Sequence, residues 1–105
     1  MSRFLNLLRR IWDYIKHIAL KVVNFFKNIV NYFKSKESIL KNNPDVIAVS
    51  IKENLRNGDY NIVNCLYDKE EDNILGYNYA QGIEAEELDA KTRNAFGNKD
   101  MIILQ

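Results

Sequence analysis

The sequence has little of what defines several common classes of protein. Its 105 residues include one cysteine, Cys65, one proline, Pro44, and four glycines. A single thiol cannot form an internal disulfide, so we expect a reducing compartment, the cytoplasm, rather than a disulfide-stapled secreted domain. With 47% hydrophobic and 28% charged residues, the composition is that of a globular protein and excludes collagen-like and disordered chains.

Long apolar runs are also missing. A membrane-spanning helix needs about 20 mostly apolar residues, and Lys21 and Lys27 interrupt the most apolar stretch. The same kind of interruption, at Asp13 and Lys16, argues against a signal peptide. Glycine-rich phosphate loops, Cys-x-x-Cys pairs and Gly-x-Ser-x-Gly elbows do not occur in the sequence. These absences favour a chain that does not span the bilayer and has no recognisable catalytic motif.

Charge is unevenly distributed along the chain. Residues 1–43 contain nine Lys or Arg against two acidic residues, whereas residues 44–105 contain six against twelve. The net charge of +1 therefore combines about +7 at the front with about −6 at the back. Such a division predicts either an anionic partner for the front half or docking of the basic front half on its own acidic back half.

Apolar residues recur every three or four positions from Phe4 to Phe33, which is the period of one helix face. This spacing predicts a single amphipathic helix over residues 1–36. The expected membrane or partner face comprises Phe4, Leu8, Ile11, Trp12, Ile15, Val22, Phe26, Ile29 and Phe33. The basic flank of that face comprises Arg9, Arg10, Lys16, Lys21 and Lys27.

Several partners would suit this helix. A basic amphipathic helix with Trp and Phe on its apolar side is typical of binding to an anionic membrane surface, where each basic residue contributes about 1 kcal/mol. The same face could instead join a helical bundle, through self-association or a protein partner, or cover the chain's own sheet. Nucleic acid is disfavoured, because the basic residues are spread along the helix and its aromatic residues would face water.

The remainder of the chain predicts short elements of mixed type. Asn43-Pro44 resembles a helix start and Asn57-Gly58 a helix end, although "VIAVSI" could alternatively form a strand. Tyr and β-branched residues favour strands in "YNIVNCLYD" and "ILGYNYA", joined by the polar turn "KEEDN". The pattern "EAEELDAKTRNAF" predicts a helix that Gly97 ends, and "MIILQ" a strand in the sheet interior.

The sequence therefore predicts an α+β protein in which a long N-terminal amphipathic helix precedes a small α-β-β-α-β domain with a three-stranded sheet. The expected divisions are a basic helix over 1–36, a linker over 37–43 and an acidic domain over 44–105. Two apolar strands and only two short helices suggest that something further must cover the second face of that sheet.

Candidate sites for chemistry are few. His17 lies among lysines, where a metal cation is disfavoured, and Cys65 sits mid-strand without a neighbouring base, as buried structural cysteines do. Asp68, Glu70 and Asp72 have the first spacings of a calcium loop, but the required later Gly and Glu are absent. We therefore expect no catalytic, cofactor or metal site and no small-molecule substrate. The expected function is non-enzymatic: peripheral attachment to the inner face of an anionic membrane, with the acidic domain binding a partner.

Overall fold

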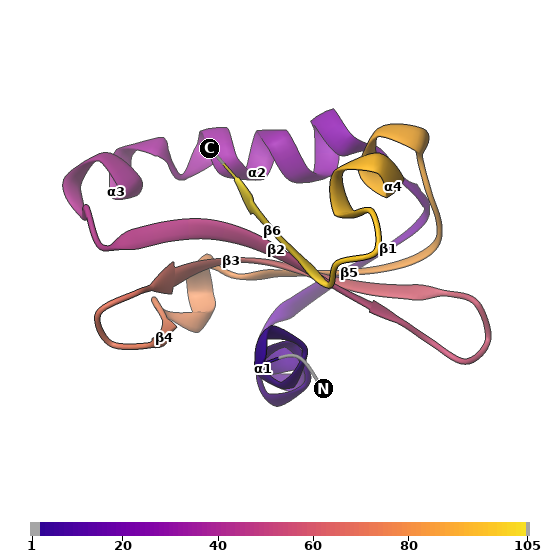
Figure 1. Ribbon diagram of the computed structural model, residues 1–105, viewed down its shortest axis with the longest axis horizontal. Helices are drawn as coiled ribbons and strands as arrows, with labels where there is room; N and C mark the ends of the chain where they lie inside the picture. Colours follow the sequence, from indigo (N-terminus) through magenta and orange to yellow (C-terminus); the bar gives the residue numbers. More distant parts are fainter. Residues whose placement is uncertain (1–2, 105) are drawn as a thin grey trace.

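The computed structural model describes residues 3–104 and has three layers, with one mixed sheet between helices on both faces (Figure 1). The strands lie in the order β1-β5-β3-β2-β6, and the short β4 pairs with β3. Their bounds are β1 Lys16–Val23, β2 Val46–Asn54, β3 Tyr60–Asp68, β4 Asn73–Ile74, β5 Gln81–Leu88 and β6 Met101–Leu104. Only β1 and β5 run parallel among these pairs; the others are antiparallel.

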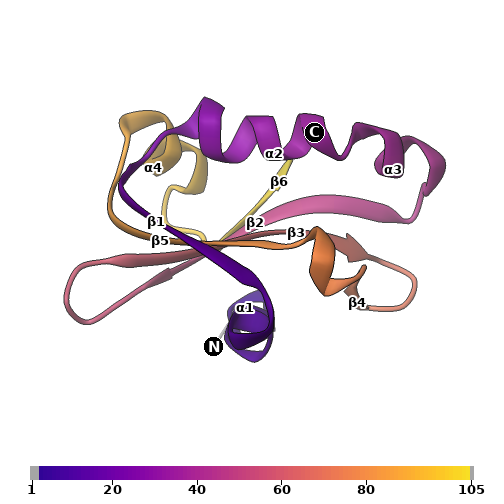
Figure 2. The ribbon, with the colours of Figure 1, turned by 180° about the vertical axis from the view of Figure 1, so that it is seen from behind.

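Helices cover the two faces unequally. On one face lies α1, followed by a short 3₁₀ turn; the opposite face carries a π-helix and three α-helices (Figures 1 and 2). Their bounds are α1 Arg3–Ile11, η1 Trp12–Tyr14, the π-helix η2 Phe25–Val30, α2 Asn31–Ser35, α3 Glu37–Asn42, η3 Tyr77–Tyr79 and α4 Ala90–Phe96. The mixed α+β class is confirmed, but the sheet has six strands rather than the predicted three.

The single helix predicted over residues 1–36 is wrong, because strand β1 interrupts it at Lys16. The segment "KHIALKVV" contains three β-branched residues, which favour extended backbone, and it gains main-chain hydrogen bonds by pairing with β5. The pairing also sets the basic β1 beside an acidic strand, with Ala19 opposite Glu84 and Val22 opposite Glu87. The spacing of apolar residues by three and four did not by itself distinguish one continuous helix from two helices separated by a strand. The expected linker over 37–43 is helical as well, since α3 occupies most of it.

The interruption sends the two halves of the apolar stripe to opposite faces of the sheet. On the α1 face, Leu8 and Ile11 pack with Val49, Val63 and Cys65 in one buried cluster. On the other face, a second buried cluster contains Ile29 and Tyr32 from the helices together with Ile62, Ile83 and Phe96. The front of the chain therefore covers its own sheet on both sides, which supplies the cover that the sequence indicated was needed.

Three predictions for the back half also need correction. The helix expected from Pro44 to Asn57 is strand β2, so the alternative reading of "VIAVSI" was right. Most of "ILGYNYA" is irregular or 3₁₀, and only Ile74 of it lies in a strand. The helix predicted over 84–96 begins only at Ala90, because Glu84 and Glu86 alternate with buried Ile83 and Ala85 as in a half-buried strand.

Two other predictions for this half are confirmed, and a third is right only in part. "YNIVNCLYD" is strand β3, at the centre of the sheet, and Gly97, with a positive φ of 58°, ends α4. The final apolar run forms β6, but at an edge of the sheet rather than in its interior. Met1, Ser2 and Gln105, which the expected first helix and last strand included, lie outside the described residues.

Candidate binding groove

The residues predicted to form one membrane or partner face do not lie together. Leu8, Ile11 and Ile29 are buried in the two cores, and four others are half-buried against those cores. These four are Phe4, Trp12, Ile15 and Phe33. Only Val22, 41% exposed, and Phe26, 51% exposed, remain open to solvent. A continuous apolar helix face is therefore not available to a partner.

The predicted basic flank is likewise distributed over separate elements. Arg9 and Arg10 are on α1, Lys16 and Lys21 on β1, and Lys27 on η2. The Arg9 Nε donates a hydrogen bond to Glu53 Oε2 at 2.6 Å. This ion pair joins the basic front half of the chain to its acidic back half and neutralises part of the charge of each. Docking of the front half on the back half was the second of the two outcomes predicted from the charge distribution.

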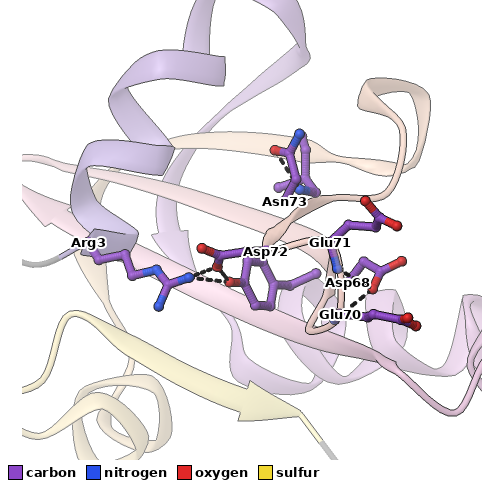
Figure 3. A network of polar contacts seen from close by, with 8 residues as sticks. Arg3, Asp68, Glu70, Glu71, Asp72 and Asn73 are labelled. Carbon is purple, nitrogen blue, oxygen red and sulfur yellow. Dashed lines mark hydrogen bonds and ion pairs between the residues drawn. The ribbon is translucent and has the colours of Figure 1, made fainter.

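A second ion pair joins α1 to the acidic turn after β3 (Figure 3). Arg3 contacts the carboxylate of Asp72 and donates to the Tyr67 hydroxyl at 2.7 Å, and that hydroxyl in turn donates to Asp72. Asp68 accepts the backbone N–H groups of Glu70 and Glu71 at 2.9 and 3.1 Å. Two of the carboxylates with calcium-loop spacing therefore have structural contacts: Asp68 caps the turn, and Asp72 joins the turn to α1. Across residues 3–104, no cluster of three His, Cys, Asp or Glu side chains is arranged to hold a metal ion.

The two remaining candidates for chemistry have structural roles. Cys65 is buried in β3, and burial raises the pKa of its thiol to about 12, so the nucleophilic thiolate is disfavoured at neutral pH. His17 stacks on Trp12 with ring centroids 4.1 Å apart and hydrogen-bonds the Trp12 carbonyl through Nε2. This stack lies over Gly82, where an added Cβ would approach His17 Cδ2 to 2.6 Å.

An open apolar groove of about 580 Å³ lies between the helices and β6. Its size is in the range that ligand sites occupy. One wall comes from η2 and α2, the other from β6, and the end of α4 closes one side. The lining residues are Phe25, Val30, Phe33, Ala95, Lys99, Met101, Ile102, Ile103 and Leu104. Lys99 is the one charged side chain among them.

The lining shows that the groove follows the free edge of β6. Successive residues of a strand point to opposite faces, yet all four residues of β6 line this single space. We infer from this lining that the groove runs along the edge of the strand. β6 pairs with β2 on its other side, and no strand of the described part of the chain pairs with this edge.

The hydrogen-bond register identifies which main-chain groups of β6 face the groove. The Lys52 N–H donates to the Asp100 carbonyl at 2.7 Å, and Lys52 lies opposite Asp100 when the β2–β6 register is extended by one pair. Hydrogen-bonded and non-hydrogen-bonded pairs alternate in an antiparallel ladder. Ile102 and Leu104 therefore bond to β2, while the N–H and C=O groups of Met101 and Ile103 point toward the free edge.

The helical wall of the groove is held in place by side-chain amides and Asp89. Asn24 Oδ1 accepts the Lys27 N–H and Asn28 Oδ1 accepts the Asn24 N–H, so the start of η2 is capped reciprocally. The Phe25 N–H donates to Asp89 Oδ2 at 3.0 Å. Buried Asn64 in β3 donates to the Asn28 carbonyl at 2.8 Å, which ties the helix to the sheet beneath it. π-Helical turns occur frequently at functional sites.

Of the residues predicted to form a partner face, only Phe33 lines the groove. Sequence reasoning missed β6, because its apolar run was assigned to the sheet interior. The run also lacks lysine and proline, two residues that commonly protect an edge strand. The composition of this run therefore gives no signal that separates an open edge from an interior strand.

Comparisons with known proteins do not assign the chain to a family: no family model, no curated protein and no solved structure matches it. Among residues 3–104, none of the helices has the length and apolar character needed to traverse a bilayer. Function must therefore be argued from the groove and the surfaces around it.

Proposed function

We propose that this chain is a protein-binding module that accepts an extended segment of another protein along the free edge of β6. The observation that carries the proposal is the coincidence of an unpaired strand edge with an apolar groove. Addition of a strand to an exposed edge is a recurrent mode of peptide recognition, in which main-chain bonds provide affinity and pockets for alternate side chains provide specificity.

The open edge favours a peptide over a small apolar ligand. A small apolar molecule could fill the groove, but it would leave the outward N–H and C=O groups of Met101 and Ile103 without strand partners. An added strand satisfies both residues and fills the groove with its side chains. Each main-chain hydrogen bond contributes about 1 kcal/mol, so the edge adds to the apolar contribution of Phe25, Val30 and Phe33.

The test uses a random peptide library displayed on phage, selected against the full chain, followed by titration of isotopically labelled protein with a selected peptide. We expect NMR shifts concentrated at Met101–Leu104 and Phe33. Ile103→Pro removes an outward N–H and should weaken binding about tenfold or more, whereas Ile103→Val keeps that N–H and should bind normally. Failure to select any peptide, or shifts located elsewhere on the sheet, would refute the proposal.

Membrane attachment remains a second candidate, now based on a different feature. Phe26 and Val22 are exposed where β1 passes into η2, and Lys21 and Lys27 are also exposed in this segment. Lys91 Nζ lies 4.3 Å from the centroid of the Phe26 ring. An aromatic ring among lysines is the composition that anionic bilayer surfaces attract.

Sedimentation with phosphatidylserine vesicles tests this candidate. Binding at low salt that Phe26→Ser abolishes and Ile103→Ser leaves intact would support it, because the second substitution removes a comparable exposed apolar side chain at the opposite edge. Equal sedimentation of the Phe26→Ser variant and the unmodified chain would dismiss it.

A further inference from the structure

We infer that the segment bound in the groove runs antiparallel to β6 and carries a carboxylate that meets Lys99. This inference rests on the proposed function, since it concerns the direction and chemistry of the same occupant. Three observations lead to it: the outward groups of β6, the face to which Ile102 and Leu104 belong, and the position of the groove's single charge.

The direction follows from the main-chain groups. Met101 and Ile103 each offer an N–H and a C=O toward the free edge, two residues apart along the strand. An antiparallel neighbour exchanges both bonds with each of these residues, through hydrogen bonds perpendicular to the strands. A parallel neighbour would meet the same groups with slanted and slightly weaker bonds. The geometry of the edge therefore favours the antiparallel direction.

The side-chain pattern of the occupant follows from the pleat. Ile102 and Leu104 pack against the core beneath η2 and α2, so occupant residues opposite them point to that same face, beside Phe25 and Phe33. These two residues, separated by one position, should be apolar. The intervening residue lies opposite Ile103, on the face where Ile103 is 47% exposed, and can be polar.

The charge of Lys99 determines where the bound segment carries its acidic residue. Lys99 is exposed, lines the groove just before β6 begins, and forms no ion pair among residues 3–104. An antiparallel occupant passes Leu104 first and Lys99 last. Its acidic residue should therefore follow the second apolar residue by about two or three positions. The expected pattern is apolar, any residue, apolar, one or two further residues, and then Asp or Glu.

A second copy of the chain fits this pattern less well than a different protein. Antiparallel pairing of two β6 strands centred on Ile102 would set the carboxylate of Asp100 opposite Leu104, against the apolar groove. Pairing centred on Ile103 avoids this, but it brings no carboxylate of the described residues to Lys99. We therefore take the occupant to be a segment of another protein.

The experiment uses a synthetic capped hexapeptide with valine at its first and third positions, threonine at its second and fourth, and glutamate at its last two. Fluorescence anisotropy measures its affinity for the full chain, and that of a version with lysine in place of both glutamates. A spin label on either end of the peptide then reports direction through broadening of NMR signals.

We expect the glutamate peptide to bind up to about fivefold more tightly than the lysine version at low salt. This difference should disappear with Lys99→Gln, which serves as the matched control because it preserves length and hydrogen-bonding capacity. A label on the first residue should broaden Leu104, and a label on the last residue should broaden Lys99.

The outcomes separate this inference from the proposed function. If peptides bind at Met101–Leu104 but the labels report the opposite direction, or lysine and glutamate are equivalent, the inference fails and the proposed function stands. If neither peptide perturbs Met101–Leu104 and the display library also yields no binder there, the proposed function fails. If β6 signals change on dilution without peptide, the occupant is a second copy and the inference is overturned.

Discussion

The two edges of the sheet differ in length, charge and attachment. Strand β1 runs for eight residues beside β5, contains Lys16 and Lys21, and continues into η2 at a junction held by Asp89. Strand β6 has four residues, all apolar, and its free edge opens onto a groove. Both edges expose an isoleucine, Ile18 at 38% and Ile103 at 47%, so exposed apolar area does not distinguish them.

The difference concerns protection against pairing. Lysines on an edge strand discourage the approach of another strand, because pairing would desolvate their charges. β1 has this protection and β6 does not. A chain that protects one edge and leaves the other apolar is consistent with use of the open edge, which is why the proposed function is assigned to β6 rather than to the longer β1.

The largest expected effect tests the orientation of the β6 main chain. Ile102→Pro removes an N–H that bonds to β2 and should lower the free energy of unfolding by about 3 kcal/mol. Ile103→Pro removes an N–H that faces the groove and should cost only about 1 kcal/mol. Urea unfolding of both variants measures this, with Ile102→Ala and Ile103→Ala as controls for loss of the side chain. Equal costs of the two prolines, after subtraction of the alanine values, would contradict the register argument.

The next effect concerns the packing beside β1. Gly82 in β5 has no positive φ, yet an added Cβ would meet His17 Cδ2 at 2.6 Å and Trp12 Cζ3 at 3.2 Å. Gly82→Ala should therefore destabilise the protein by about 2 kcal/mol through overpacking. In a His17→Ala background the cost should fall below half of that value, since the tightest contact is gone. An unchanged cost in that background would show that the His17–Trp12 stack does not restrict this position.

The sequence contained enough information for the class of fold and for its central strand, but not for the first 36 residues. Phe4 to Phe33 satisfy a helical period, and this local pattern is compatible with α1 and η2 individually. What breaks the helix is non-local: β1 gains its hydrogen bonds from β5, more than sixty residues away in the chain. The spacing of apolar residues along the chain cannot reveal a pairing partner so distant in the sequence.

The groove was inaccessible to sequence reasoning for a related reason. Phe25 and Val30 meet Ile102 and Leu104 only because η2 and β6 are neighbours in space, although about 70 residues separate them in the sequence. An apolar run such as "MIIL" suits an interior strand and an open edge equally well. Strand order decides between them, and strand order depends on the pairing of β2 with β6.

A smaller effect is expected at the junction that holds the end of β1. Asp89 accepts hydrogen bonds from the N–H groups of Phe25 and Thr92, and its own N–H donates to the Val23 carbonyl. Burial alone would raise the pKa of the carboxyl, but hydrogen bonds from Thr92 and Phe25 and the charge of Arg93 outweigh it and lower that pKa. Loss of this helix cap in Asp89→Ala should cost about 1 kcal/mol.

The pH dependence of that cost has a defined sign. Because the folded-state pKa of Asp89 lies below its unfolded value, its stabilisation is complete above about pH 4 and is lost as the pH falls through the folded value. The gap in unfolding free energy between Asp89→Ala and the unmodified chain should therefore narrow in acid. A gap that stays constant from neutral pH down to pH 2 would contradict the assignment of a lowered pKa.

The smallest effect on stability accompanies the sharpest test of edge protection. The double variant Lys16→Thr with Lys21→Thr replaces two exposed lysines of β1 by residues that favour strands, so the free energy of unfolding should change by no more than about 0.5 kcal/mol. Its solution behaviour should change more, because an edge of eight residues without lysine is open to pairing with another copy. Sedimentation velocity over a range of concentrations should then detect association that the unmodified chain does not show.

The matched control is Lys34→Thr with Lys41→Thr, which makes the same change in net charge at exposed helical positions. If only the β1 variant associates, the lysines act where a strand would pair, and they give β1 a protection that β6 lacks. If both variants associate, the loss of charge is sufficient and position is irrelevant. If neither does, the contrast between the edges depends on the groove beside β6 and not on the lysines of β1, and the proposed function must then rest on the groove alone.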